Sequence, residues 1–509
     1  MKTIACIVLT IISVSNCFAQ PNRFDVKHLP QKNDTLQQSE TAVVIPTPAG
    51  DYLMAVTGGG YYNLNPSALN YSYFYIAKIS PTGIITYIKS YADTLMQMFG
   101  MRAIIKTHSN SYVVVGSRDY NSGKKNAALF KINGNGDTLF TKEFVLGDES
   151  HFYSATETYD NALLLVGQNQ PLAGSGNLTQ SLIIKTDSMG NELWRHQYGG
   201  ANNYDGANSV VTTKDSGALV LSVMQQIGSP NPHILLYKID SLGGVEWQQN
   251  YATATAERCE KIIATTDGNY LMIGTQLMAS GDNQGLLIKI DSAGTVLWQK
   301  TPGLVNREEA FSSVTETTNN NFVVVGSSTT NNPTSSIQFI WKFNSIGDSL
   351  WQRNLYVDSN YIFATMYSIA HAQDGGLFLN GTFQQHYNTP PYGNHVNTWL
   401  VKTDSLGCYI AGCNTVGLST TRTTALGSLV IQPNIFSTEA MVTYTVPNNE
   451  EALYLDIYNI TGTLVKTYTL PANATTYKLS AQELNQGVKL AVLRTNTTHI
   501  STQKIVIIN

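Results

Sequence analysis

A short pattern recurs seven times along the chain at nearly constant spacing. Three apolar residues precede a Lys, then Ile or Thr, an Asp or Asn, two further residues, a Gly and, four positions later, an aromatic residue. The third copy runs from Ile183 through Lys185 and Asp187 to Gly190 and Trp194. The Gly recurs at Gly83, Gly136, Gly190, Gly243, Gly294, Gly347 and Gly407, at intervals of 51 to 60 residues. A fixed period in this range indicates a repeat architecture.

Each repeat contains a second block, a turn followed by an apolar run that usually ends in Gly, as in residues 267–274. The two blocks together define four strand-like runs per unit, and helical periodicity is absent. In the fifth unit the runs are 261–265, 270–273, 285–290 and 295–300. Four antiparallel strands in about 50 residues form one blade of a β-propeller. The sequence therefore predicts an all-β chain built around a seven-bladed β-propeller.

The aromatic residue four positions after the Gly is present in six of the seven copies. Each ring can bury about 150–250 Å². We interpret these residues as structural wedges between adjacent blades, because the same position repeats around the ring; the alternative is a cofactor box. They are Tyr87, Phe140, Trp194, Trp247, Trp298 and Trp351.

The Lys five positions before the Gly is present in all seven copies: Lys78, Lys131, Lys185, Lys238, Lys289, Lys342 and Lys402. We expect these lysines to face the edges of the blades, where their charge discourages strand addition. A ring of cations that binds a polyanion is the alternative.

The N-terminal residues predict export. Lys2 precedes an apolar stretch that is too short to span a bilayer, and Cys17-Phe18-Ala19 resembles a cleavage site, which predicts a signal peptide over residues 1–19. A lipoprotein with Cys17 as the lipidated residue is the alternative. No later segment is long and apolar enough for a transmembrane helix.

The propeller is expected to span residues 20–413. Its seventh repeat lacks the aromatic residue, which is replaced by Ala411, and its fourth strand is not recognisable. We expect residues 24–28, beginning at Phe24, to supply the outer strand of the last blade and so close the ring. Because export favours disulfides, Cys408 and Cys413 are predicted to pair, which leaves Cys259 as a free, packed thiol.

The run Lys185-Thr186-Asp187-Ser188-Met189-Gly190, followed by Trp194, resembles the tryptophan-docking motif of quinoprotein-like propellers. That group includes quinone-dependent dehydrogenases and non-enzymatic scaffolds. The vicinal Cys pair and the calcium-binding acids of the enzymes have no counterpart in this chain. The resemblance therefore supports the fold and implies no catalysis.

A linker rich in Thr, Ser and Gly follows at residues 414–428, and residues 429–509 then show a different pattern of alternating strands, typical of a small β-sandwich. These residues resemble the type A C-terminal sorting domain of the type IX secretion system. Ile435 and Lys489 stand where that family has Pro and an aromatic residue. The resemblance implies recognition by the type IX secretion machinery and a secreted or surface-attached protein of a Gram-negative bacterium.

The loops between the second and third strands of each blade vary in length, and two of them are rich in aromatic residues. Loops on a rigid scaffold commonly carry function, and loops rich in Tyr and Asn suit contacts with a glycan or a protein. The binding candidates are Tyr61, Tyr62, Tyr71, His386, Tyr387, Tyr392 and His395. Ordinary polar cover is the alternative.

Acidic residues gather where each fourth strand leads into the next blade, and Glu257, Glu308 and Glu309 are the weak candidates for an acid–base pair of the glycosidase type. No cluster of His or Cys has the spacing of a metal site, and no motif indicates a cofactor. A net charge of −4 with 13% charged residues excludes a basic nucleic-acid surface.

These observations predict an exported propeller that is a non-enzymatic module binding an extracellular glycan or protein. The alternatives are a secreted hydrolase that uses the rim acids, and a structural adhesin or surface-layer component.

Overall fold

The computed structural model describes residues 24–26, 37–61, 70–91, 96–120, 124–170, 178–200, 203–229, 231–251, 255–303, 307–330, 336–355, 361–385, 395–409, 428–445, 452–459, 463–471, 474–495 and 499–508. The chain divides into two compact units, Met1–Asn414 and Thr415–Asn509. The leader predicted for residues 1–19 lies outside the described residues.

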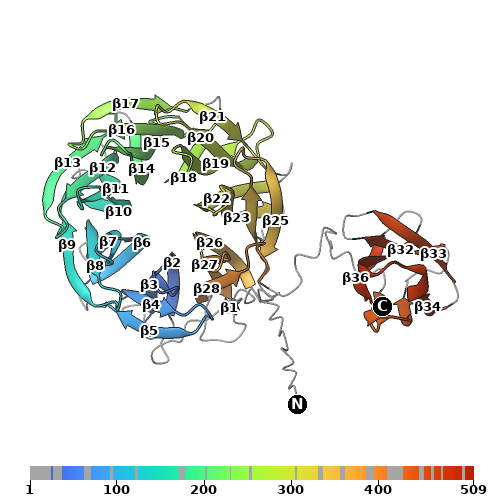
Figure 1. Cartoon of the computed structure of the whole chain (residues 1–509). Helices are drawn as coiled ribbons and strands as arrows, with labels where there is room; N and C mark the ends of the chain where they lie inside the picture. Colours follow the sequence, from blue (N-terminus) through green and yellow to red (C-terminus); the bar gives the residue numbers. More distant parts are fainter. Residues whose placement is uncertain are drawn as a thin grey trace, which may run out of the picture. The chain divides into compact units, whose positions relative to one another are not determined.

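The first unit is a seven-bladed β-propeller, in which four-stranded antiparallel sheets follow one another around an axis (Figure 1). The first four blades comprise β2 (Gln37–Pro46), β3 (Tyr52–Tyr61), β4 (Asn70–Ile79) and β5 (Ile85–Ser90); β6 (Met96–Lys106), β7 (Tyr112–Tyr120), β8 (Lys125–Ile132) and β9 (Thr138–Phe144); β10 (Glu149–Glu157), β11 (Leu163–Gln170), β12 (Gln180–Thr186) and β13 (Glu192–Tyr198); and β14 (Asn203–Thr212), β15 (Ala218–Gln226), β16 (His233–Ile239) and β17 (Val245–Asn250).

The remaining three blades complete the ring. They comprise β18 (Glu257–Ala264), β19 (Tyr270–Leu277), β20 (Asn283–Ile290) and β21 (Val296–Lys300); β22 (Arg307–Glu316), β23 (Phe322–Thr330), β24 (Ser336–Phe343) and β25 (Ser349–Leu355); and β26 (Tyr361–His371), β27 (Leu377–Gln385) and β28 (His395–Thr403) with β1 (Phe24–Val26).

The outer strand of the seventh blade is β1, which comes from the other end of the unit. It pairs antiparallel with β28 in the register Phe24↔Lys402 to Val26↔Leu400. The segment before the first repeat and the last repeat therefore share one sheet, and this pairing covers an edge of β28 that would otherwise be open.

The burial of each strand follows its place in the blade. Third strands such as β12 are buried along almost their whole length, because a neighbouring blade packs on each face. Fourth strands such as β13 alternate between half-buried and exposed residues, because their second face meets solvent. Separate apolar clusters, each made by the facing sides of two adjacent blades, replace a single core.

The repeated lysines do not face the blade edges, so that expectation is wrong. Lys289 is 2% exposed, and its Nζ lies 3.1 Å from Oδ2 of Asp267 in the turn between the first two strands of the same blade. The equivalent pairs are Lys78–Asp51, Lys185–Asp160, Lys238–Asp215 and Lys402–Asp374. The third strand carries the Lys into the blade interior, and a carboxylate compensates its loss of hydration.

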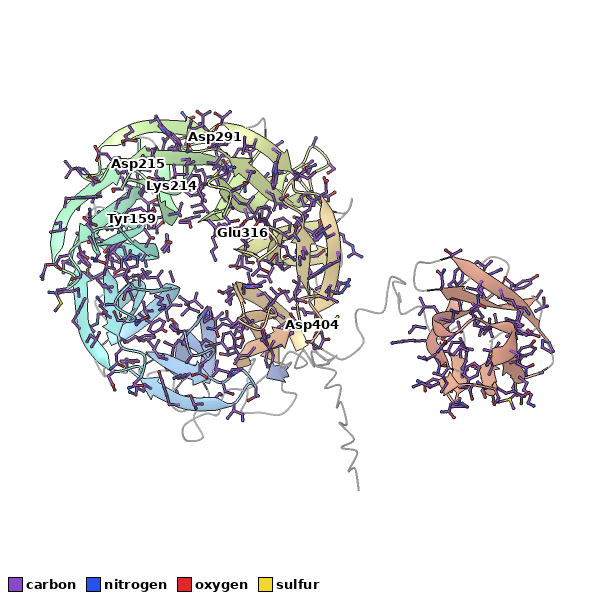
Figure 2. All side chains as sticks on the ribbon, viewed as in Figure 1. Tyr159, Lys214, Asp215, Asp291, Glu316 and Asp404 are labelled. Carbon is purple, nitrogen blue, oxygen red and sulfur yellow. The ribbon has the colours of Figure 1, made fainter. Side chains whose placement is uncertain are left out.

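The two tight turns of each blade lie on one face of the propeller, because consecutive strands are antiparallel. Figure 2 labels residues from these turns, and Glu316, at the end of a first strand, lies nearer the axis than Asp291, in a turn before a fourth strand. The variable loops between second and third strands therefore lie on the opposite face.

The second unit is a small β-sandwich. One sheet contains β29 (Ser428–Gln432), β31 (Glu439–Thr445) and β34 (Thr476–Ser480). The other contains β30 (Ile435–Phe436), β36 (His499–Ile507), β35 (Gly487–Arg494), β32 (Leu453–Asn459) and β33 (Leu464–Leu470), and a 3-10 turn spans Ala481–Glu483. Residues from both sheets, including Val442, Tyr444, Leu455 and Ala491, form one apolar cluster between them. Ile435 is exposed, whereas Lys489 is buried.

Among the residues that the structure describes, no helix has the length and apolar character needed to cross a membrane.

Candidate functional site

The first strand of each blade contains an irregularity that the sequence patterns did not predict. In the third blade, Phe152 and Ser154 pair with consecutive residues of β11, so Tyr153 has no partner across the ladder. The same register shift occurs in β14, β18, β22 and β26. The residues that it leaves without a partner across the ladder are Asn208, Glu260, Ser312 and Tyr367. Such β-bulges turn one side chain out of the regular alternation.

The Gly at the end of the second-strand block is the sequence signal for this bulge. Gly274 lies opposite Cys259, and a Cβ added to it would come within 1.9 Å of the Arg258 carbonyl oxygen. Gly167 and Gly381 are equally confined by the carbonyls of His151 and Thr365. Only Gly allows this approach of two backbones, so the recurring Gly marks the bulge, although its meaning requires the strand pairing.

The bulges surround a cavity on the propeller axis. It has a volume of about 810 Å³, and residues of all seven first strands line it. Tyr153, Asn208, Glu260, Ser312 and Tyr367 are all among them. Closure of the ring thus brings the five described bulge residues from five different blades to one site.

The cavity wall combines aromatic, amide and hydroxyl side chains. Tyr204 joins the two bulge tyrosines, and Gln168 and Gln225 add amides near the ends of the second strands β11 and β15. Thr179 and Pro232, just before the third strands β12 and β16, also line it. The cavity therefore extends toward the face that carries the variable loops.

The residue after each bulge also lines the cavity. It is Ser154, Ser209, Ser313 and Ser368 in the third, fourth, sixth and seventh blades, and Lys261 in the fifth. The Lys261 Nζ donates a hydrogen bond to Ser313 Oγ at 3.0 Å. Burial lowers the pKa of the Lys261 ammonium to about 8, because the charged form loses hydration.

Asp205 is the buried acid of the cavity wall. Its side chain accepts a hydrogen bond from the Gly200 N–H at 2.9 Å on Oδ2, while Oδ1 has no hydrogen-bond partner among the described residues. Burial raises the pKa of this carboxyl, and the bond from Gly200 only partly offsets that rise.

The three acids predicted as catalytic candidates lie elsewhere. Glu257, 1% exposed, contacts His233 Nδ1 at 3.1 Å, and Glu309, 2% exposed, accepts a hydrogen bond from Ser328 at 3.2 Å. Glu308 accepts a hydrogen bond from the Asn283 N–H at 3.2 Å. None of the three lines the cavity, and the contacts of Glu257 and Glu308 join one blade to the preceding one.

Most loop residues predicted to bind a ligand cannot be placed. Tyr62, His386, Tyr387 and Tyr392 lie outside the described residues. Tyr61, Tyr71 and His395 are located only as strand residues, which pair with Asn70, Gly60 and Gln385 respectively. Their role in binding stays a prediction.

The six aromatic residues expected as wedges lie where adjacent blades meet. The Trp247 ring packs on Gly294 of the next blade, where an added Cβ would come within 2.8 Å of it. Phe140, Trp298 and Trp351 meet Gly190, Gly347 and Gly407 in the same way. Tyr251, four residues after Trp247, donates a hydrogen bond to the Gly294 carbonyl at 2.7 Å. The ring, the Gly and the hydroxyl together form one inter-blade contact.

The cysteines occupy different environments. Cys408 is disulfide-bonded, and Cys413, its predicted partner, lies outside the described residues. Cys259 is a buried free thiol within the cluster between the fourth and fifth blades, and burial raises its pKa. In the described part of the chain, no group of three or more His, Cys, Asp or Glu residues could hold a metal ion.

Comparison with known proteins identifies the C-terminal unit. Residues 431–508 match the model of the secretion system C-terminal sorting domain. The chain is therefore an exported seven-bladed propeller whose sorting domain directs it to the type IX secretion machinery. No protein with a curated description matches the chain.

Several solved structures resemble the chain at low identity. They include a protein of unknown function from Dyadobacter fermentans (9% identity, 75% of this chain and 100% of that one, TM-score 0.42). An α-L-arabinofuranosidase of Fusarium graminearum (14%, 75% and 98%, TM-score 0.39) and a subtype N11 neuraminidase-like protein of A/flat-faced bat/Peru/033/2010 (H18N11) (11%, 76% and 95%, TM-score 0.40) also resemble it.

Proposed function

We propose that this exported protein is a non-enzymatic module that binds a glycan in the central cavity of its propeller. The lining of that cavity carries the proposal. Tyr153, Tyr204 and Tyr367 offer aromatic faces, and Gln168, Asn208 and Gln225 offer amides that can both donate and accept hydrogen bonds. A pocket with a few convergent polar groups among larger contact surfaces suits a ligand rich in hydroxyl groups.

The cavity also satisfies the steric needs of such a ligand. Its volume of about 810 Å³ lies within the range of small-molecule sites, and several of its residues come from strand ends on the loop face. Tyr61, Tyr71 and His395, which adjoin two of the loops, are proposed to extend the contact. The three acids predicted for a hydrolase lie on separate contacts outside the cavity, whose own acids are Asp205 and Glu260.

A glycan array probed with the mature full-length chain tests the proposal. We expect binding to a defined set of glycans, and a loss of about tenfold or more in affinity when Tyr153 and Tyr367 are both replaced by Ala. The matched control is Tyr159→Ala, because Tyr159 is 59% exposed on the tight-turn face and does not line the cavity (Figure 2).

Two results would contradict the proposal. In the first, the chain binds no glycan, and a protein partner is captured equally by the variant with Ala at positions 153 and 367 and by Tyr159→Ala. That result would indicate a protein ligand that binds at another surface. Release of new reducing ends from a bound glycan, lost in the cavity variant, would show an enzyme instead of a binding module.

A further inference from the structure

One cation in the central cavity, Lys261, differs from four of the buried lysines of the propeller. Lys185, Lys238, Lys289 and Lys402 each lie within 3.1 Å of an Asp carboxylate. The Lys261 Nζ instead donates to the neutral hydroxyl of Ser313, and among the described residues it pairs with no carboxylate. A partly buried ammonium without a counterion is unfavourable, as the lowering of its pKa shows.

The free-energy cost of burying the Lys261 ammonium is informative because of the position that Lys261 occupies in its blade. In four other blades the equivalent position is a Ser, which would fit the same place in the ring without a buried charge. The fifth blade therefore places a charge in the cavity wall where the fold itself requires only a small polar residue. Among the described residues the Lys261 ammonium contacts the next blade only through the neutral hydroxyl of Ser313.

A second cation accompanies Lys261 on the same strand. Arg258 is exposed, lines the cavity and has no carboxylate partner among the described residues. The wall also contains two acids, Asp205, which accepts the Gly200 N–H and is 2% exposed, and Glu260, which lies between the two cations in the chain. Among the described residues neither Lys261 nor Arg258 forms a salt bridge with an acid.

We infer that the central cavity recognises an anionic glycan, whose sugar-borne carboxylate or sulfate lies on Lys261 and Arg258. This inference rests on the proposed glycan-binding function and adds the charge of the ligand to it. Charge-assisted hydrogen bonds are short and roughly twice as strong as neutral ones, and Arg can bind a carboxylate with two parallel bonds. The bound anion would supply the counterion that Lys261 lacks, while Ser313 keeps its ammonium in place.

The experiment compares wild type with Lys261→Met on a panel of neutral, carboxylated and sulfated oligosaccharides, using the mature full-length chain and titration calorimetry on the hits. We expect anionic glycans among the ligands, and a loss of affinity of about tenfold or more for them in Lys261→Met, with neutral ligands unchanged. The carboxylated and sulfated arms separate the two sources of the anion. Lys214→Met, which removes an exposed Lys from the tight-turn face (Figure 2), is the matched control and should leave all affinities unchanged.

A melting experiment separates a binding role for Lys261 from a structural one. Because Met removes a buried charge that lacks an acid, Lys261→Met should melt at the same temperature as wild type or higher. A carboxylated or sulfated ligand should raise the melting temperature of wild type and not that of the variant. A clear loss of stability in Lys261→Met without ligand would overturn the inference, because it would show that the charge serves the fold.

The remaining outcomes distinguish the inference from the proposed function. If neutral glycans bind, lose affinity in the Tyr153 and Tyr367 variant and are preferred over anionic ones, the inference is wrong and the proposed function stands. If no glycan of any charge binds, both are wrong.

Discussion

The turn Gly of each repeat satisfies two separate constraints at the scale of one residue. Gly294 has a φ of +83°, which favours Gly, and an added Cβ would come within 2.8 Å of the Trp247 ring from the preceding blade. Gly281 has a similar φ of +91°, but nothing lies within 4 Å of the place of its Cβ. The two positions therefore separate the cost of backbone strain from the cost of crowding.

Replacing Gly294 by Ala should destabilise the propeller more than replacing Gly281. Both variants force Ala into the left-handed region, at a cost of about 1–2 kcal/mol. Gly294→Ala must also displace an indole ring in a packed interface, which adds about 1–3 kcal/mol. Chemical denaturation of the two variants beside wild type measures the difference. Equal losses of stability would mean that the ring does not confine the Gly.

The blade is the element that repeats, and five of the seven blades contain an ion pair that involves the repeated Lys. Five blades place an Asp in the first turn and pair it with the Lys of the third strand. In the sixth blade Asn319 stands at the position of Asp267, and burial lowers the pKa of Lys342. The chain therefore includes blades in which the Lys has an Asp partner and a blade in which Asn takes the place of that Asp.

Exchanging the acid and the amide between blades should transfer the stabilisation. Asp160→Asn should destabilise the propeller by about 1 kcal/mol, a modest value because Asp160 is largely exposed, and Asn319→Asp should stabilise it by giving Lys342 a partner. Thermal melting of both variants, with the double variant as control, measures these changes. A loss of stability in Asn319→Asp would show that the turn of the sixth blade cannot reach Lys342.

The Asp160 pair also has a defined pH dependence. Burial alone would raise the pKa of Asp160, but the hydrogen bond from Lys185 lowers it from 3.8 to about 2. A carboxyl with a lowered pKa stabilises the fold above the pKa of the unfolded chain, and this contribution disappears as the pH falls through the folded value. The difference between wild type and Asp160→Asn should therefore be constant from pH 7 to about pH 5 and then fall progressively, disappearing only below the folded pKa of about 2.

At the scale of the whole molecule, the sorting domain and the propeller are separate compact units. Residues 415–509 form their own compact unit, with an apolar cluster that includes no propeller residue. Within it, the buried Asp456 receives a 2.6 Å contact from Arg494 Nε and a hydrogen bond from Thr467.

Deleting residues 429–509 should leave the propeller folded but abolish its passage across the outer membrane. Fractionation of cells that express the truncated chain should show it retained within the envelope, while wild type reaches the surface or the medium. A full-length Arg494→Gln variant tests the same unit without deleting it. This variant leaves Asp456 buried without its cation, so the free energy of unfolding of the sandwich should fall by about 3 kcal/mol. Normal release of the truncated chain would contradict the role assigned to this unit.

The sequence alone was sufficient for the blade count, the positions of the tight turns, the residues at the blade contacts and the sorting domain. These features depend on contiguous residues, such as Asp291 and Gly294 in one turn or Trp247 a fixed distance after Gly243, so they repeat in the order of the chain. The same reasoning failed for the lysines, because their burial depends on an Asp from another strand of the blade.

Only the tertiary structure revealed the central cavity. Tyr153, Glu260 and Tyr367 have no common sequence pattern, and each is set apart by a bulge that exists only when two strands pair. They meet because the blades close around an axis, which places residues from distant repeats on one cavity wall. Periodicity within a chain determines which units form, whereas a site shared by many units arises only when the ring brings them together.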